Sequence, residues 1–195
     1  MVPKANYFVH DRALCDSAQI GVETRIWAYC HIMPGAKIGN QTNIGEHVFI
    51  ENDVSIGNGC TIKNGVAIWD GVTIEDHVFV GPYVVFTNDL KPRAFLKKKK
   101  PLLLPTWIRK GATIGANATI ICGITIGEFA VIGAGSVITR NVPAHALVLG
   151  NPGKIAGKVC FCGETLTSED YCVTCELPLN LNSMNLTLKL KVAAP

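Results

Sequence analysis

The stretch IGVETRIWAYCHIMPGAKIGNQTNIGEHVFI, residues 20–50, places isoleucine at every sixth position. The series continues without a miss to Phe86, with Val80 and Phe86 as its two other residue types, and a second series runs from Ile108 to Ile138. Helical amphipathicity repeats near 3.6 residues and a simple strand repeats at about 2, so neither alone gives a strict period of six. The period therefore indicates a repeated structural unit.

A second layer of pattern supports the first. Glycine often follows the aliphatic residue, as at Gly21, Gly39 and Gly127, where it relieves the steric limit on a turn. Two positions before the aliphatic residue stands a small or β-branched residue: Ala18, Thr24, Cys30, Ala36, Thr42, Val48, Val54, Cys60, Val66, Val72 and Val78. We expect each six residues to form one short strand and one turn, with the aliphatic side chain inward and successive coils stacked about 4.8 Å apart. An ordinary sandwich or barrel predicts irregular spacing, so the sequence favours an all-β, parallel β-solenoid.

Composition sets further bounds on the class of protein. A chain of 195 residues suits one main domain with a small appendage. Its net charge of +3 is too small to indicate a nucleic-acid partner, and no apolar run approaches membrane-spanning length. The N-terminal stretch MVPKANYFVHDRALCD lacks the apolar centre of a signal peptide. We therefore expect a cytoplasmic protein with no nucleic-acid and no membrane partner.

Four of the eight cysteines cluster near the end of the chain, in CFCGETLTSEDYCVTC. Cys160 and Cys162 form one close pair, and Cys172 and Cys175 form a C-x-x-C pair. Two such pairs suit a tetrahedral zinc site, which is structural because four protein ligands leave no position open for water. Disulfides are the alternative, and a reducing cytoplasm disfavours them. We predict a solenoid domain over residues 1–158 and a zinc-binding tail over residues 159–195.

The six-residue series stops at FTNDLKPRA, residues 86–94. The next inward aliphatic residue after Phe86 is Ile108, twenty-two positions later, which leaves sixteen extra residues if the segment is a pure excursion between neighbouring strands. Long loops in compact domains are usually functional, so we expect an extruded loop over residues 87–107 to border a site. Its lysine run, residues 97–100, is either a solvated surface or a contact for ligand phosphates.

Three stretches resemble a known family: TRIWAYCHIMPGAKIG (24–39), TIEDHVFVGPYVVFTNDLKPRA (73–94) and GATIGANATIICGITIGEFAVIGAGSVITRNVPAHALVLGNPGK (111–154). They are similar to hexapeptide-repeat acyltransferases, and most similar to bacterial N-acetyltransferases that modify 3-amino sugars on UDP or dTDP for surface polysaccharide synthesis. The resemblance spans residues 7 to about 160. It implies a left-handed β-helix with three strands per coil, a homotrimer, and acyl-CoA, by default acetyl-CoA, in the groove between neighbouring solenoids.

The resemblance also suggests roles for individual residues. Asn88 matches the loop asparagine that binds the sugar amine in the branch where the departing CoA sulfur takes the proton. Asp89 is a second catalytic candidate, because a carboxylate beside the amine orients it or accepts its proton, at the cost of favouring the protonated amine. Many relatives use a loop histidine as base, and this loop has none between Phe86 and Ile108. CoA-binding candidates are turn glycines and the positions that match the family: Gly115, Ala116, Gly133, Ala134, Thr139, Arg140, Asn151 and Pro152.

The nucleotide sugar has five further candidates. Trp69 either stacks on a base or packs on the solenoid. Asp70 and Glu75 are candidates for hydroxyl groups, and His31 and His47 either reach the diphosphate or are ordinary surface residues. Two other functions are weighed against the transferase. A γ-type carbonic anhydrase needs three zinc-binding histidines, two of them close in sequence, and the closest pair here is sixteen apart. A non-catalytic scaffold has no need of the FTND loop or the GNP segment.

Overall fold

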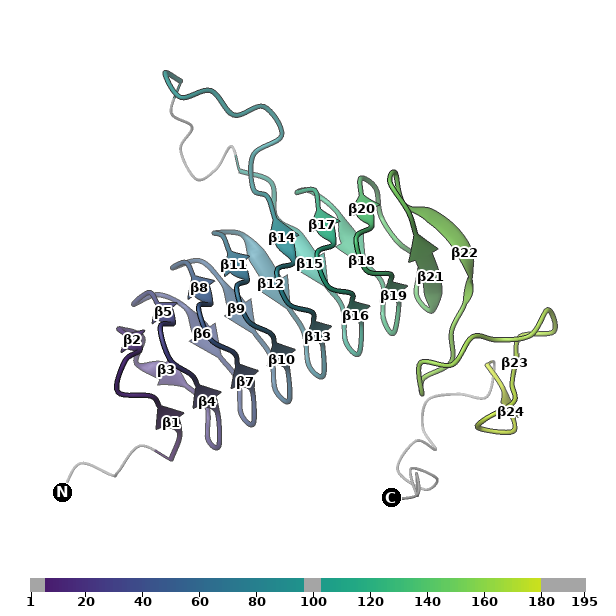
Figure 1. Ribbon diagram of the computed structural model, residues 1–195, viewed down its shortest axis with the longest axis horizontal. Coiled ribbons are helices and arrows are strands. Elements are labelled where there is room, and N and C mark those ends of the chain that lie inside the picture. Colours follow the sequence, from purple (N-terminus) through teal and green to yellow (C-terminus); the bar gives the residue numbers. More distant parts are fainter. Residues whose placement is uncertain (1–5, 97–102, 180–195) are drawn as a thin grey trace.

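The computed structural model describes residues 6–96 and 103–179, and its strands wind into three parallel sheets that run the length of a solenoid (Figure 1). Sheet A contains β1 (Phe8–Val9), β4 (Arg25–Ile26), β7 (Asn43–Ile44), β10 (Thr61–Ile62), β13 (Phe79–Val80), β16 (Thr113–Ile114), β19 (Val131–Ile132), β21 (Ala146–Leu149) and β22 (Lys154–Lys158). Sheet B contains β2 (Leu14–Cys15), β5 (His31–Ile32), β8 (Phe49–Ile50), β11 (Ala67–Ile68), β14 (Val85–Phe86), β17 (Thr119–Ile120) and β20 (Val137–Ile138). Sheet C contains β3 (Gln19–Ile20), β6 (Lys37–Ile38), β9 (Ser55–Ile56), β12 (Val72–Ile74), β15 (Thr106–Ile108) and β18 (Thr125–Ile126).

Each coil is one turn through the three sheets. Arg25 pairs with Asn43, and Asn43 pairs with Thr61, so equivalent residues stand eighteen positions apart. Three six-residue units therefore make one coil, and the backbone N–H and C=O groups of each short strand bond to the coils on either side. The predicted all-β parallel solenoid is confirmed.

The interior is a stack of aliphatic side chains, as the six-residue series predicts. Ile26, Ile44, Ile62 and Ile114 are among those with no exposed surface. The small residues two positions earlier also face inward from Thr24 to Val78. Ala18 is the exception: it is exposed, and Ser17 is buried in its place and donates to the carbonyl of Ala36 at 2.6 Å.

The first coil was missed by the series because it is one residue short. Phe8 of β1 pairs with Arg25, and Leu14 of β2 pairs with His31, each seventeen positions further on. The six-residue count therefore fails before Ile20 although the coil stacks like the others. The buried hydroxyls near this end of the solenoid form hydrogen bonds between coils. Thr24 Oγ1 accepts from the N–H of Thr42, and Thr42 Oγ1 accepts from the N–H of Cys60, both at 3.1 Å.

The loop leaves and re-enters the solenoid without disturbing it. Across the break Val85 pairs with Thr119, thirty-four positions on instead of eighteen, which confirms sixteen extra residues in a pure excursion. Figure 1 shows the segment after β14 projecting well away from the body before β15. The re-entry strand begins at Thr106, slightly earlier than the predicted loop end at 107. The lysine run at 97–100 lies outside the described residues.

The solenoid ends in a reversal of strand direction. β22 is antiparallel to β21 and covers the last parallel edge of sheet A, and its final residue is Lys158, the last residue of the predicted solenoid domain. Within the tail, β23 (Tyr171–Cys172) and β24 (Leu177–Pro178) form a two-stranded antiparallel sheet. Nowhere in residues 6–96 and 103–179 does a helix reach the length and apolar character needed to cross a membrane.

Candidate functional site

The turns that lead from sheet B to sheet C form an edge that we call the BC corner. Its turns begin at equivalent positions in successive coils, because Ala67, Val85, Thr119 and Val137 pair in register. From the coil before the loop onward, the BC corner contains Trp69–Asp70, Thr87–Asn88, Ile121–Cys122 and Thr139–Arg140. The structure thus brings two predicted sugar-binding residues, the loop asparagine and two predicted CoA-binding residues onto one corner.

The base of the loop is fixed by backbone contacts. Thr87 donates its N–H to the carbonyl of Ile120 at 3.2 Å, and its hydroxyl accepts from the N–H of Cys122 at 2.9 Å. The carbonyl of Asn88 accepts from the N–H of Leu104 at 3.1 Å, which closes the two ends of the loop. Within the described part of the chain, the half-buried side-chain amide of Asn88 has no hydrogen-bond partner. Its backbone is therefore held while its amide stays available to a ligand.

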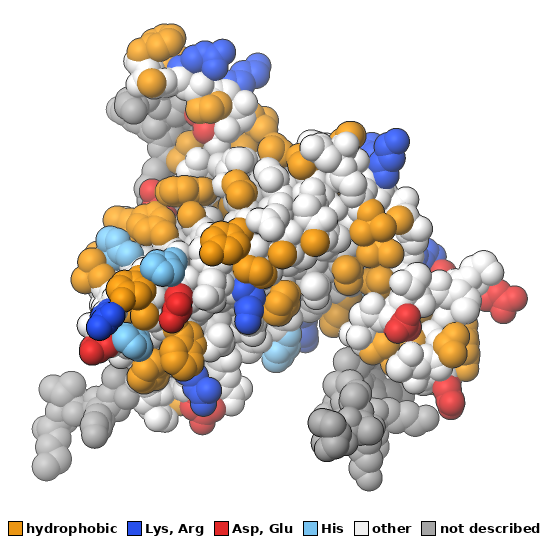
Figure 2. Space-filling model, in the orientation of Figure 1, with side chains coloured by type: hydrophobic (Ala, Val, Ile, Leu, Met, Phe, Trp, Pro, Cys, Tyr) orange, Lys and Arg blue, Asp and Glu red, His pale blue; other side chains and the backbone are white. Residues whose placement is uncertain are grey.

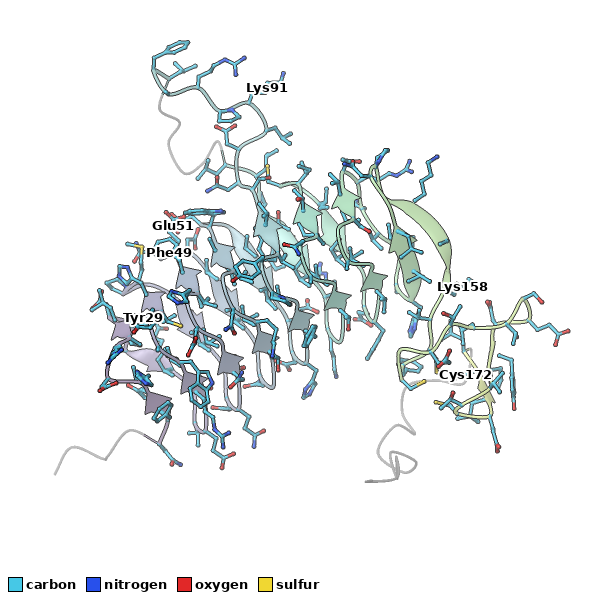
Figure 3. All side chains as sticks on the ribbon, viewed as in Figure 1. Tyr29, Phe49, Glu51, Lys91, Lys158 and Cys172 are labelled. Carbon is cyan, nitrogen blue, oxygen red and sulfur yellow. The ribbon has the colours of Figure 1, made fainter. Side chains whose placement is uncertain are left out.

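Asp89 is engaged with the loop itself. Its Oδ1 accepts from the N–H of Lys91 at 2.8 Å, a local turn that directs the chain into the projecting loop. Figure 3 shows Lys91 far out on that loop, away from the body of the solenoid. The geometry gives Asp89 a turn-forming role, and its predicted part in catalysis stays a prediction.

Asp70 is buried one coil before Asn88, at 8% exposure. Its Oδ1 accepts from the N–H of Asp53 at 2.6 Å, and its own N–H donates to Glu51 Oε2 at 2.7 Å. Glu51 was missed in the sequence, although it stands eighteen positions before Trp69 and so occupies the same turn of the preceding coil. Together these bonds fix the turn that neighbours the loop base.

The aromatic side chains beside this turn form a ladder across coils. The ring of Trp69 lies 5.6 Å from that of Phe49, and Phe49 lies 5.6 Å from His31. His31 Nε2 is 3.3 Å from Asp16 Oδ2. Trp69 thus packs on the solenoid, one of its two predicted roles, while base stacking stays a prediction. His31 faces outward on sheet B, three coils before the loop.

A second set of predicted residues lies on the AB corner, the turns from sheet A to sheet B. Gly115–Ala116 and Gly133–Ala134 are successive turns there, after β16 and β19. A Cβ on Gly115 would lie 2.5 Å from the backbone nitrogen of Ala134. Coil stacking alone therefore requires glycine at Gly115, and CoA binding by these turns stays a prediction.

Two predicted substrate residues stand away from the loop base within one chain. His47 is on the AB corner, where its ring stacks on Tyr29 at 4.9 Å. Glu75 is on the third corner, between sheets C and A, where it bonds Arg109 Nη1 at 2.6 Å and the N–H of Lys110 at 2.9 Å. The Arg109 guanidinium also lies 5.1 Å from the Trp107 ring centroid. Glu75 is thus committed to a structural ion pair.

The segment Gly150–Gly153 takes the place of a further strand beyond β20. Val137 donates its N–H to the carbonyl of Gly150 at 3.0 Å, and Gly153 donates back to the carbonyl of Val137 at 2.8 Å. The peptide bond between Asn151 and Pro152 is cis. A small cleft of about 50 Å³ is lined by Thr139, Arg140, Gly153 and Ile155, among others. The predicted Thr139–Arg140 pair and the predicted Asn151–Pro152 segment are therefore neighbours.

The four tail cysteines converge as predicted. Their sulfur atoms all lie within 4.8 Å of one another, with Cys160 to Cys175 at 3.8 Å and Cys162 to Cys172 at 3.7 Å. A tetrahedral zinc ion with Zn–S bonds of about 2.3 Å sets sulfur atoms roughly 3.8 Å apart. All four cysteines are free thiols, so the structure contains no disulfide among them.

The thiols also influence one another's ionisation. Burial raises the pKa of Cys160. For Cys172, burial opposes ionisation, yet the Cys175 N–H and the neighbouring thiols together lower its pKa. Interaction with Cys162 and burial raise the pKa of Cys175. Four sulfur atoms this close together are the arrangement expected of a cluster that binds a soft cation.

The comparisons with known proteins agree with this architecture. The family profile described as bacterial transferase hexapeptide (six repeats) matches residues 17–52, 53–88 and 105–140, and the gap between the last two matches is the extruded loop. The chain is 52% identical, over 87% of itself and 87% of the relative, to the dTDP-3-amino-3,6-dideoxy-alpha-D-galactopyranose 3-N-acetyltransferase of Aneurinibacillus thermoaerophilus.

Solved structures show the same fold. A hexapeptide-repeat acetyltransferase of Vibrio cholerae, complexed with acetyl coenzyme A, superposes with a TM-score of 0.56 at 29% identity, over 64% of this chain and 70% of that one. A GDP-perosamine N-acetyltransferase variant of Caulobacter crescentus, complexed with CoA and GDP-perosamine, has a TM-score of 0.50 at 21% identity, over 77% of this chain and 56% of that one. The repeat pattern, the coil register and these matches confirm the predicted resemblance: the chain belongs to the bacterial transferase hexapeptide family.

Proposed function

We propose that the protein is an acyl-CoA-dependent N-acetyltransferase that acts on the amine of a 3-amino sugar carried by dTDP or UDP, in the synthesis of surface polysaccharide. The observation that carries the proposal is the 52% identity to a dTDP-3-amino-sugar N-acetyltransferase over 87% of both chains. The BC corner supports it, because Asp70, the loop asparagine and the Thr139–Arg140 turn all lie on that corner, with only the Ile121–Cys122 turn between the last two. The carbonic anhydrase and scaffold alternatives gain no such support.

The chemistry needs few protein groups. The neutral amine nitrogen attacks the thioester carbonyl carbon, a C–N bond forms, and the C–S bond breaks as the tetrahedral intermediate collapses. The departing CoA thiolate takes the proton that the amine nitrogen loses, so no protein base is required. The carbonyl of the Asn88 amide accepts a hydrogen bond from the amine and directs its lone pair at the thioester. Asp70 holds the turn beside it.

We propose that the active form is a homotrimer of left-handed β-helices. The predicted CoA-binding residues divide between the AB corner (Gly115, Ala116, Gly133, Ala134) and the BC corner (Thr139, Arg140), on opposite edges of sheet B. Two chains side by side would place the AB corner of one next to the BC corner of the other, which would give a groove lined by both sets. Exposed apolar residues on sheet B and the AB corner, among them Leu14 (53%), Tyr83 (61%) and Val85 (49%), support such a contact. Figure 2 shows apolar side chains interspersed with histidines over the N-terminal coils.

We further propose that residues 159–195, of which 180–195 lie outside the described residues, form a zinc-binding tail in which Cys160, Cys162, Cys172 and Cys175 hold one structural zinc ion. Two sulfur separations of 3.7 and 3.8 Å match a tetrahedral site, and all four sulfur atoms lie within 4.8 Å of one another. A cytoplasmic location follows as part of the proposal, because thiolate ligands stay reduced there.

The test of the function is a product screen. Purified protein with acetyl-CoA is offered dTDP- and UDP-linked 3-amino sugars, 4-amino sugars and the matching 3-hydroxy sugars, and products are read by mass spectrometry. We expect an acetyl mass increment with at least one 3-amino sugar and none with its 3-hydroxy counterpart. Acetylation of the hydroxy sugar with equal efficiency, or no acetylation of any amino sugar, would refute the proposal.

A further inference from the structure

The last strand of the solenoid is poorly held by burial. β22 follows directly on the Gly150–Gly153 segment, and of its five residues four are exposed and one is half-buried. Its pairing with β21 changes register between Leu147 and Val148. A strand with no buried side chain contributes little hydrophobic stabilisation, so its position depends on what fixes its two ends.

One end of β22 is fixed by the tail. Immediately after Lys158, the N–H of Val159 donates to the carbonyl of His145 at 2.8 Å, and His145 Nδ1 lies 2.9 Å from the carbonyl oxygen of Val159. Phe161 then packs edge-on against Phe129 at 4.7 Å and against His145 at 4.6 Å. Cys160 stands between Val159 and Phe161, so the anchoring contacts flank a cluster cysteine.

The tail has almost no apolar core with which to maintain these contacts. Among its described residues, 159–179, the buried side chains are Val159, Cys160 and Cys172, and the last two belong to the four-cysteine cluster. The remaining links to β22 are the N–H of Leu166 on the carbonyl of Lys158 at 2.9 Å and the exposed Lys158–Asp170 pair at 2.5 Å. Figure 3 shows Lys158 at the end of β22 and Cys172 in the tail below it. A zinc ion held by the four cysteines would therefore be the main source of order in this segment.

The other end of β22 meets the candidate acyl-CoA site. Gly153 is bonded to Val137 of β20, and Gly153 and Ile155 line the same cleft as Thr139 and Arg140. A displacement of β22 therefore moves one wall of that cleft and loosens the Gly150–Gly153 segment.

From this chain of contacts we infer that zinc in the four-cysteine cluster clamps β22 and thereby holds the Gly150–Gly153 segment in its acyl-CoA-binding position, so that metal occupancy controls acyl-CoA affinity. The inference rests on the proposed function for the identity of the ligand. If zinc loss leaves the segment ordered about one tenth of the time, the apparent Kd rises about tenfold. The effect is on binding, because none of the described tail residues, 159–179, forms a hydrogen bond with Thr87 or Asn88 at the loop base that would hold the amine.

The experiment compares the full-length protein in three states: zinc-loaded, stripped with a chelator, and reloaded with zinc. Zinc content is measured by elemental analysis, acetyl-CoA affinity by calorimetry, and local order by hydrogen exchange of residues 150–158 and of the coils at 106–138. We expect about one zinc per chain. Stripping should weaken acetyl-CoA binding about tenfold and raise exchange in 150–158 while the coils stay protected, and reloading should restore both.

Two substitutions sharpen the test. Phe161→Ala should keep zinc yet bind acetyl-CoA as weakly as the stripped protein, because it cuts the contact between the cluster and the solenoid. Cys15→Ser, at a half-buried cysteine of the first coil, is the matched control and should change neither zinc content nor affinity.

Three results would overturn the inference, and they can be told apart. If the protein binds no zinc, the proposed metal site is wrong. If acetyl-CoA affinity is equal with and without zinc, zinc does not hold the Gly150–Gly153 segment in its binding position. If zinc-loaded protein fails to bind acetyl-CoA, the proposed function is wrong. Hydrogen exchange in residues 150–158 then still reports whether zinc orders β22.

Discussion

Replacement of Asn88 by alanine removes the side chain that we propose binds the amine of the sugar substrate. The hydrogen bonds that close the loop use the backbone carbonyl of Asn88 and the side chain of Thr87, so both persist in Asn88→Ala. Loop geometry and protein stability should therefore survive the change. What is lost is a half-buried amide that has no other hydrogen-bond partner in the described residues.

The expected fall in kcat/KM follows from the half-buried position of the Asn88 amide. A single hydrogen bond at a half-buried site is worth about 1.5–3 kcal/mol when it is made only as the reaction proceeds, which is roughly a 10- to 100-fold fall in kcat/KM. If the amide also prevents unproductive amine orientations, the fall reaches about 1000-fold. Acetyl-CoA affinity should change little, because its predicted contacts lie on later coils.

The assay is steady-state kinetics with the amino sugar found in the product screen, together with acetyl-CoA calorimetry. The matched control is Asn52→Ala, because Asn52 occupies the same BC-corner position two coils earlier and lies away from the loop. His31→Ala and His47→Ala should weaken substrate binding at most. Near-wild-type kcat/KM in Asn88→Ala, together with loss of kcat in either histidine variant, would refute the base-free mechanism and identify that histidine as the base.

Three further predictions concern the solenoid. Gly115→Ala should lower the free energy of unfolding by about 1–3 kcal/mol in urea titrations, because its Cβ meets the backbone of the next coil at 2.5 Å. Ile74→Ala, at a side chain 1% exposed, should cost about 2–5 kcal/mol in the same titration, and a cost under 1 kcal/mol would contradict the packed interior. Burial raises the pKa of Cys60 to about 11 from 9.0. The stabilisation that the protonated thiol provides is therefore complete below pH 9 and lost as the pH rises through 11. Over that range the free energy of unfolding of the wild type should fall by about 3 kcal/mol more than that of Cys60→Ala.

The solenoid could be predicted from the sequence because each coil repeats the same burial requirement. Ile26, Ile44 and Ile62 each fill an identical inward position, so one short rule describes the whole core. The rule fails where a coil departs from eighteen residues. It misses the seventeen-residue first coil with Phe8 and Leu14, and it gives no information about the antiparallel β22, whose side chains are not buried.

The site was harder to predict because function uses the outward positions, which carry no periodic burial signal. The convergence of the four cysteines could be predicted because metal ligands come in close pairs. Their docking on the solenoid could not, since it depends on Phe161 meeting Phe129 and His145, three aromatic residues sixteen apart that do not follow the eighteen-residue coil register. The ion pair of Glu75 with Arg109 spans the loop and is equally absent from local patterns.

The coil register nevertheless provides a rule that applies to outward residues as well. Residues eighteen apart share a corner, and residues six apart lie on adjacent corners. Asn52, Asp70 and Asn88 therefore share the BC corner, whereas Glu75, five positions beyond Asp70, must lie one corner away. The same count identifies Glu51 as the neighbour of Trp69 one coil earlier. The AB and BC corners lie at opposite edges of sheet B, so two chains packed side by side can bring the AB corner of one chain next to the BC corner of the other. The division of the CoA-binding candidates between the AB and BC corners is thus an argument for a site shared between subunits, and it follows from the count of residues before any contact is measured.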